Sequence, residues 1–475
     1  MRFIVLVLDG LRPDLVVPAT MPHLARLAAA GARFARARSV FPSETRVACA
    51  SLATGSRPGA HGLAANTLFD AGVLPDRLLR TAEAGDLALL VPPGGDSPLG
   101  RPTLGVRLAA AGRRLAVVSG GTSGSAFLLF PEAERLGGFR WNVADTAGAA
   151  AARVRARCGP TPPQAVPNAA RVVFLGRVLT ELVLPELRPD VALLWCPEPD
   201  LSGHYLGLGA GATREVALRA ADDLVGRVAA WRDAQPDAAE IGLVVLSDHG
   251  MVTGPRKVSL AEALRRAGFR AGTSLDAGAD VVVAPGAAPG LWLRDAAALA
   301  GPVAGFLAAQ PWTAALLARD PAALGLADAL PLALFGAAHP RAPDLMLAFA
   351  GEEAPDPGGL PGTAPFDVAD VPEGGAMHGG LHRRELATVL LMQGGPFRRG
   401  AVVQGAADLS DLAPTLLHLL GTAAEGMEGR VLRAAWDGAA DAPPERETRA
   451  LPRGFALELM RQEGRRYPTA LTRAV

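Results

Sequence analysis

The chain of 475 residues has few cysteines, a single lysine and no net charge. Its three cysteines, Cys49, Cys158 and Cys196, cannot all pair, and none lies in a C-x-x-C motif. The sequence therefore predicts reduced thiols and no disulfide framework. Lys+Arg and Asp+Glu each number 47, so no overall charge attracts the chain to nucleic acid or to an anionic membrane.

Long hydrophobic runs are also absent. No apolar stretch approaches the roughly 18 residues that a membrane-spanning helix needs. The apolar residues 3–8 are too few for a signal peptide, end at Asp9 and precede no small-residue cleavage site. We therefore expect a buried first strand, no membrane partner and a cytoplasmic protein. Because the chain is longer than one core normally supports, it should form two domains or one domain with insertions.

Short apolar runs bounded by turn residues recur along the chain. Their continuous apolar character is typical of strands covered on both faces. Such runs occupy residues 3–8, 115–119, 191–196, 241–247, 280–283 and 388–392, and helical patterns occupy residues 21–30, 45–54, 213–234 and 409–420. This alternation predicts an α/β fold with a doubly wound, mostly parallel central sheet and helices on both faces.

Residues 253–375 have a different character. They contain short elements, many prolines and glycines, and a loop-like acidic stretch at 351–375. We expect this region to be an inserted cap that determines substrate specificity. Residues 1–252 and 376–475 would then form one catalytic α/β domain.

Carboxylates and imidazoles follow three of the predicted strands. These residues are Asp9, the pair Asp200 and His204, and the pair Asp248 and His249. Ligands of doubly wound sheets bind beyond the carboxyl ends of the strands, so these side chains should meet there. Asp and neutral His are suitable ligands for zinc and related metals. Each residue alone is explained by a turn or a helix cap, but their joint occurrence predicts a metal site.

A helix is expected to begin at Thr45. A threonine there is ordinarily an N-cap, but Ala48 stands where a capping box needs Glu or Gln. The free N–H groups of a helix N-terminus suit a phosphate, and a metal-bound Thr45 alkoxide would be aligned for attack. Asn66 follows a glycine-containing loop and would donate hydrogen bonds to phosphate oxygens; the alternative is a simple turn residue.

These segments together resemble the alkaline phosphatase superfamily, closest to its type I phosphodiesterase/nucleotide pyrophosphatase branch. The resemblance is carried by residues 7–12, 41–45, 54–62, 198–204, 247–251 and 378–380, with 411–417 and 426–430 similar to the family's closing helix and tail. It implies an alkaline phosphatase-like fold. It also implies hydrolysis of phosphate diesters or pyrophosphates through a phospho-threonine intermediate on Thr45.

The resemblance further implies two divalent metal ions, usually zinc. One metal would be held by Asp9, Thr45, Asp248 and His249, and the other by Asp200, His204 and His378, with Asn66 binding phosphate. His382 lies four residues after His378 and is the alternative ligand, but the adjoining Gly379-Gly380 favours His378.

Arg46 departs from the pattern of nucleotide-cleaving members, which carry base-stacking aromatic residues near the nucleophile. A guanidinium beside the phosphate would bind a second charged oxygen, unless Arg46 points away. A phosphomonoesterase or phosphonate hydrolase with the same metals is therefore the first alternative. A non-catalytic binding protein is the second, and the filled ligand positions oppose it. In either catalytic case the expected partner is a small phosphate ester, not a nucleic-acid polymer.

Overall fold

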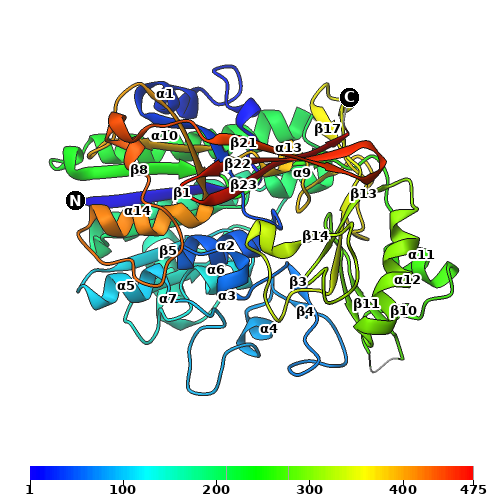
Figure 1. Ribbon diagram of the computed structural model, residues 1–475. Helices are drawn as coiled ribbons and strands as arrows, with labels where there is room; N and C mark the ends of the chain where they lie inside the picture. Colours follow the sequence, from blue (N-terminus) through cyan, green and yellow to red (C-terminus); the bar gives the residue numbers. More distant parts are fainter. Residues whose placement is uncertain (210, 276–277, 474–475) are drawn as a thin grey trace.

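The computed structural model describes residues 1–209, 211–275 and 278–473 (Figure 1). At its centre is an eight-stranded sheet with the order β20-β2-β19-β8-β1-β7-β5-β6. The strands are β1 (Arg2–Leu8), β2 (Ala32–Arg38), β5 (Leu115–Ser119), β6 (Phe139–Asn142), β7 (Val191–Cys196), β8 (Ile241–Leu246), β19 (Leu390–Gln393) and β20 (Ala401–Asp408). Of these eight, only β19 runs antiparallel to its neighbours. The prediction of a mostly parallel central sheet is confirmed.

Strand β1 contributes to a hydrophobic core on each face of this sheet. Phe3, Val5 and Val7 belong to one core, and the alternate residues Ile4, Leu6 and Leu8 belong to the other. The first core includes side chains of α2 (Thr45–Thr54), α5 (Leu104–Ala110), α6 (Ser123–Leu129) and α14 (Leu412–Leu419). The second includes side chains of α1 (Pro22–Ala30), α7 (Gly148–Cys158), α8 (Ala169–Arg177) and α10 (Leu218–Asp233). Helices therefore cover both faces, as predicted (Figure 1).

Shorter elements connect these layers. They are α3 (Pro58–His61), α4 (Ala84–Ala88), α9 (Asp200–Leu206), α13 (Arg383–Leu386) and the small pair β3 (Thr67–Leu68) and β4 (Leu79–Arg80). In the described part of the chain, no helix combines the length and the apolar character needed to cross a bilayer.

A second sheet of six strands lies within the region predicted to be an insertion. Its order is β10-β11-β12-β15-β13-β14. The strands are β10 (Ala271–Gly272), β11 (Val281–Ala284), β12 (Gly290–Leu293), β13 (Thr313–Ala318), β14 (Leu330–Pro331) and β15 (Leu345–Phe349), and α11 (Leu260–Arg266) and α12 (Ala296–Ala308) share their core. The division of the chain at residues 253 and 375 remains a prediction.

The two ends of this region lie side by side in a four-stranded sheet ordered β16-β17-β9-β18. Its strands are β9 (Val252–Thr253), β16 (Glu352–Pro355), β17 (Pro361–Thr363) and β18 (Ala376–Met377). Strand β18 pairs antiparallel with β9, so Ala376 is opposite Thr253 and Met377 is opposite Val252. The chain thus leaves and re-enters the main body at one place, beside the carboxyl end of β8.

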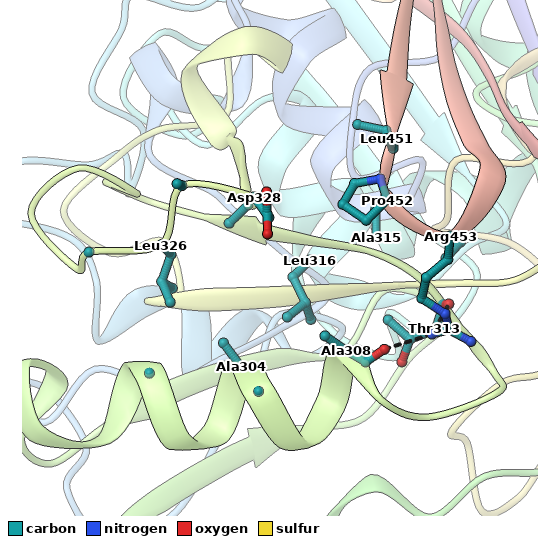
Figure 2. Close-up of a pocket in the computed structure, with 16 residues that line it drawn as sticks. Ala304, Ala308, Thr313, Ala315, Leu316, Leu326, Asp328, Leu451, Pro452 and Arg453 are labelled. Carbon is teal, nitrogen blue, oxygen red and sulfur yellow. Dashed lines mark hydrogen bonds between the residues drawn. The ribbon is translucent and has the colours of Figure 1, made fainter.

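The C-terminal residues form an antiparallel sheet that the sequence reasoning did not predict. It consists of β21 (Glu445–Leu451), β22 (Phe455–Gln462) and β23 (Arg465–Arg473). Arg453, in the turn between β21 and β22, donates from one guanidinium nitrogen to the carbonyls of Ala308 and Gln310, both at 2.7 Å, and Thr313 at 3.2 Å. Figure 2 shows this contact beside a cavity of about 470 Å³. These hydrogen bonds therefore connect the C-terminal sheet to the region of the second sheet.

Candidate active site

The polar residues predicted at strand ends meet beyond the carboxyl edge of the main sheet. Asp9 follows β1, Asp200 opens α9 just after β7, and Asp248 follows β8 by one residue. The backbone N–H of Asp9 donates to the carbonyl of Cys196 (3.0 Å), and that of Asp200 donates to the carbonyl of Asp9 (3.0 Å). Because β7, β1 and β8 are adjacent and parallel, their ends bring these carboxylates together.

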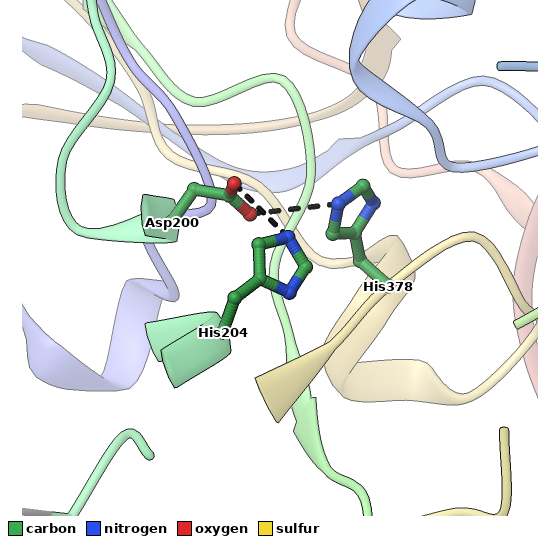
Figure 3. A group of neighbouring side chains, drawn as sticks. All are labelled: Asp200, His204 and His378. Atoms are coloured by element: carbon green, nitrogen blue, oxygen red, sulfur yellow. Dashed lines mark ion pairs between the residues drawn. The ribbon is translucent and has the colours of Figure 1, made fainter. Parts of the chain in front are cut away.

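Asp200, His204 and His378 form the first cluster (Figure 3). The Oδ2 atom of Asp200 lies 3.1 Å from Nε2 of His204, and its Oδ1 atom lies 3.5 Å from Nε2 of His378. Asp200 and His204 are four residues apart in α9, so one helical turn presents both to the same side. His378 comes from the segment after β18, 174 positions after His204 in the sequence.

The second cluster surrounds His249. Its Nε2 atom lies 3.0 Å from Oδ2 of Asp248, 3.5 Å from Oδ1 of Asp9 and 3.2 Å from Oγ1 of Thr45. Ligand atoms of Asp9, Asp200 and His249 also lie within 4.8 Å of one another. Asp200 thus borders both clusters. The predicted residues of the two metal sites are all brought together at one place.

Three carboxylate oxygens at this place have no hydrogen-bond partner. They are Oδ1 of Asp9, Oδ1 of Asp200 and Oδ2 of Asp248, and all three are buried. Each lies within 3.5 Å of an imidazole Nε2, yet in none of these pairs does the geometry make a hydrogen bond. Leaving a buried acceptor unsatisfied costs about 1–3 kcal/mol, and more for a charged group. The oxygens and the imidazole nitrogens together fit divalent cations of the zinc type.

The second ring nitrogen, Nδ1, of each imidazole lies within hydrogen-bonding distance of a backbone carbonyl. Nδ1 of His204 lies 2.7 Å from the carbonyl of Ala376, and Nδ1 of His378 lies 2.9 Å from that of Ser43. His249 is held similarly, at 3.1 Å from the carbonyl of Gly250. A proton on Nδ1 leaves the lone pair on Nε2, which is the arrangement that metal-binding histidines normally have.

The carboxylates are oriented by donors outside the clusters. Trp195 in β7 donates its indole N–H to Oδ2 of Asp9 at 2.9 Å. The backbone N–H of Gly10 donates to Oδ1 of Asp248 at 3.1 Å. Gly10 has φ +71°, and a Cβ atom there would lie 2.9 Å from Cβ of Asp200. Only glycine therefore allows the first loop to approach α9 this closely.

Burial and neighbouring charges shift the pKa values of the clustered groups. The pKa of Asp9 is raised well above its usual value, first by burial and then by the negative charges of Asp248 and Asp200. Burial and the neighbouring His249 lower the pKa of His378 well below its usual value. Burial also acts on Asp200, but His204 and His378 outweigh it and lower that pKa. Bound cations would offset the mutual repulsion of the carboxylates.

Thr45 is the first residue of α2 and is 4% exposed. Its neighbour Arg46 donates its backbone N–H to Oδ1 of Asn66 at 3.1 Å, which leaves the Nδ2 amide of Asn66 to act as a donor. The backbone N–H of Asn66 is bound by Oε2 of Glu44. The predicted nucleophile and the predicted phosphate-binding amide therefore lie side by side, held by the residues that flank Thr45.

The competing histidines have other roles. His382 caps α13: its Nδ1 atom accepts the N–H of Arg384 at 3.2 Å, and its Nε2 atom lies 3.2 Å from the carbonyl of Glu352. His61 lies 3.0 Å from the Ser51 hydroxyl, and burial lowers its pKa to about 3. Within the described chain, neither histidine belongs to a cluster of possible metal ligands. The choice of His378 over His382 thus agrees with the geometry.

Several residues around the site are not predictable from the sequence. Trp195 falls within a predicted strand, but its bond to Asp9 depends on the pairing of β7 with β1. Asn168 and Arg171 lie far from every motif, yet they line a cavity of about 350 Å³ that also reaches Thr45. No local pattern identifies such residues, because only the tertiary fold places them there.

Comparison with known proteins decides the family. The sequence profile described as type I phosphodiesterase/nucleotide pyrophosphatase matches residues 3–354. The chain belongs to this family. The resemblance inferred from the motifs is confirmed, and the chain is a hydrolase of the phosphodiesterase/pyrophosphatase kind. No curated protein matches the sequence.

Solved structures support the same fold. Murine ectonucleotide pyrophosphatase/phosphodiesterase 5 (ENPP5) superimposes with a TM-score of 0.64 at 16% identity, over 92% of this chain and all of that one. An inactive threonine-to-alanine variant of that murine protein in complex with AMP gives a TM-score of 0.63, with the same identity and coverage. At this identity the likeness concerns the fold alone, which is alkaline phosphatase-like as predicted.

Proposed function

We propose that this family member hydrolyses phosphate diesters or pyrophosphates through a phospho-threonine on Thr45, with the help of two divalent metal ions. The observation that carries the proposal is the set of three buried, unpartnered carboxylate oxygens that face imidazole nitrogens next to Thr45. Asp9, Thr45, Asp248 and His249 would hold one ion, and Asp200, His204 and His378 the other. Zinc suits this His/Asp donor set.

When bound, the two ions would neutralise charge on the phosphoryl oxygens and lower the pKa of the Thr45 hydroxyl. In the first step, Oγ1 of Thr45 forms a bond to phosphorus while the bond to the leaving alcohol or phosphate breaks. In the second step, a water oxygen bonds to phosphorus and Oγ1 of Thr45 leaves. Burial of Thr45 in the first turn of α2 holds its hydroxyl in one orientation, which favours in-line attack.

Asn66 would stabilise charge on the phosphoryl group. Its Oδ1 atom is occupied by the N–H of Arg46, so its amide hydrogens are the part that can donate. Such pre-organised donors contribute most when they meet oxygens whose negative charge grows in the transition state. Glu44 holds the backbone of Asn66 and so keeps this amide beside Thr45.

The structural relative supports a threonine-dependent mechanism of this kind. Its threonine-to-alanine variant is described as inactive and binds AMP. By analogy, a small phosphate ester is the expected substrate here, and no nucleic-acid polymer is expected. We also place the enzyme in the cytoplasm, where its three free, buried cysteines (Cys49, Cys158, Cys196) would remain reduced.

A phosphomonoesterase or phosphonate hydrolase is the second candidate, because Arg46 lines the cavity next to Thr45. Rates on bis-aryl and mono-aryl phosphates, measured with protein of known metal content, separate the two. We expect the bis-aryl phosphate to be preferred. A clear preference for the mono-aryl phosphate would establish the second candidate instead.

The mechanism is tested with Thr45→Ala and Thr45→Ser. We expect the alanine variant to lose activity while keeping the fold, and the serine variant to keep part of it, because it retains a hydroxyl. A phosphorylated residue trapped by acid quench should map to Thr45 in the parent enzyme. Full activity in Thr45→Ala would refute the phospho-threonine mechanism.

A further inference from the structure

The cavity beside Thr45 is lined by groups of two kinds. Asp9, Thr45 and Asp200 line it where it meets the metal-ligand clusters. Arg46 and Arg171 also line it, from α2 and α8. At about 350 Å³ the cavity is in the size range of small-ligand sites, so a bound phosphoryl group would leave room for a substituent.

Neither arginine of this cavity is paired directly with a carboxylate, although the charge of Arg46 partly offsets the burial that raises the pKa of Glu44. Among the described residues, neither Arg46 nor Arg171 forms an ion pair, and the buried Nε atom of Arg46 has no hydrogen-bond partner. Nε of Arg171 donates to the carbonyl of Pro162 at 2.9 Å, and one terminal nitrogen lies 3.4 Å from Oε1 of Gln164. These bonds fix the Arg171 side chain without neutralising it. A partly desolvated guanidinium without a counter-charge is costly unless an anion pairs with it.

Asn168 supplies a further donor to the cavity. It lines the cavity and is 2% exposed. Its backbone N–H donates to Oε1 of Glu198 at 2.7 Å, and its Oδ1 atom accepts the N–H of Ala165 at 3.4 Å. In the described chain its Nδ2 amide makes no hydrogen bond. Glu198 also accepts from the hydroxyl of Ser202 in α9 at 2.9 Å, so Asn168 is fastened to the helix that carries Asp200.

The remaining lining is not suited to a flat apolar group. In the described chain, no aromatic side chain lines the cavity. Besides the two carboxylates of the metal clusters, Glu83 is the one acidic residue of the lining, and it is exposed. The cavity therefore offers guanidinium and amide donors in a rigid setting, with no surface on which a base could stack.

We propose that this cavity binds a second negatively charged group of the substrate, carried by a substituent of the reacting phosphoryl group. Arg46, Arg171 and Asn168 are its specificity residues. The chemistry fits a carboxylate or a second phosphate, since both accept paired hydrogen bonds from arginine. This inference rests on the proposed function, because it assumes that the phosphoryl group lies at Thr45.

Binding of non-hydrolysable ligands tests the proposal directly. The ligands are propylphosphonate, 2-carboxyethylphosphonate and ethane-1,2-diphosphonate, which have similar length and differ in the second charge. Titration calorimetry on the zinc-loaded enzyme should show at least one of the two ligands with a second anionic group binding about tenfold or more tightly than propylphosphonate. The tighter of the two identifies the second group as carboxylate or phosphate.

The variants Arg46→Gln and Arg171→Gln should each reduce this preference by about tenfold or more, and in Arg171→Gln the affinity for propylphosphonate should stay unchanged. Arg171 belongs to α8, away from Thr45, so its substitution leaves the nucleophile undisturbed. Arg219 is exposed on α10, so Arg219→Gln is the matched control and should leave the preference for a second anionic group unchanged. Equal affinity for all three ligands in the parent enzyme, or an unchanged preference in both variants, would overturn the inference.

Hydrolysis separates this inference from the proposed function. If the enzyme cleaves a bis-aryl phosphate whose aryl groups are uncharged, Arg171→Gln should keep that activity but show a raised KM for the analogous ester with a carboxylate on its retained aryl group. If no ester is cleaved, the proposed function fails, and the calorimetric preference still decides whether the cavity binds a second anion.

Discussion

The bond between Trp195 and Asp9 provides a test of how the metal site is positioned. Trp195 is fully buried in β7, opposite Val7 of β1, and its indole N–H reaches Oδ2 of Asp9 at 2.9 Å. The other carboxylate oxygen of Asp9 has no hydrogen-bond partner and faces His249. In Trp195→Phe the donor is lost, so the carboxylate loses the bond that holds its Oδ2 atom and is less strongly oriented toward the cluster.

The expected magnitude follows from the charge of the acceptor. A hydrogen bond to a charged group contributes about 1.5–3 kcal/mol, which corresponds to roughly 10–100-fold in a binding constant. Loss of outer partners of metal ligands typically lowers metal affinity by about the same 10–100-fold. We therefore expect Trp195→Phe to bind zinc 10–100-fold more weakly, with a comparable loss of activity at limiting zinc that excess zinc restores.

The assay is competition for zinc with a chromophoric chelator. Trp141→Phe is the matched control, because Trp141 is an equally buried tryptophan in β6 that makes no bond to a clustered carboxylate. Both variants should lose some stability through the smaller side chain, but only Trp195→Phe should lose zinc affinity. Unchanged zinc affinity in Trp195→Phe would refute the argument that this indole positions Asp9.

Three further changes are predicted. Asn66→Ala should lower kcat by about 10²–10³-fold with little effect on zinc content, measured by steady-state kinetics and metal analysis, because a transition-state donor is removed. Gly10→Ala should weaken zinc binding, because the added Cβ atom would displace Asp200. Gly112 has a similar φ but open space around it, so Gly112→Ala should lower stability without changing zinc affinity. Equal zinc affinity in the two variants would contradict this. Burial raises the pKa of Glu385 to about 7, so the folded state binds this proton more tightly than the unfolded state does. The free energy of unfolding should therefore fall by roughly 3 kcal/mol as pH rises from about 4.5 to about 7. Denaturation across this range should show a smaller fall in Glu385→Gln, and an identical pH dependence would contradict the assignment.

The sequence predicted the parts of the fold that depend on continuous apolar runs. Strands β1, β5, β7 and β8 are buried throughout, apart from the first residue of β1, and their runs are recognisable without tertiary information. Strand β2 lacks a continuous apolar run, because arginines separate its apolar residues, so the same pattern does not identify it. The C-terminal strands lack such runs as well, and no residue of β21 is buried.

The site residues that follow strands were predictable from the sequence, whereas those brought in by tertiary contacts were not. Asp9, Asp200 and Asp248 could be placed together because each follows a strand of one parallel sheet. His378 could be assigned only through the family resemblance, because it reaches the site from the far side of the inserted region. Trp195 and Arg171 could not be predicted, since the position of each depends on strand register or on helix packing between segments distant in the sequence.

Anomalous diffraction at the zinc edge, from crystals of the zinc-loaded enzyme, would show whether two cations lie beside Thr45. We expect two peaks, one in contact with Asp248 and His249 and the other with His204 and His378. Metal analysis of the same protein should give two zinc ions per chain. An absence of anomalous peaks at these residues, with zinc present in the crystal, would contradict the proposed two-metal site.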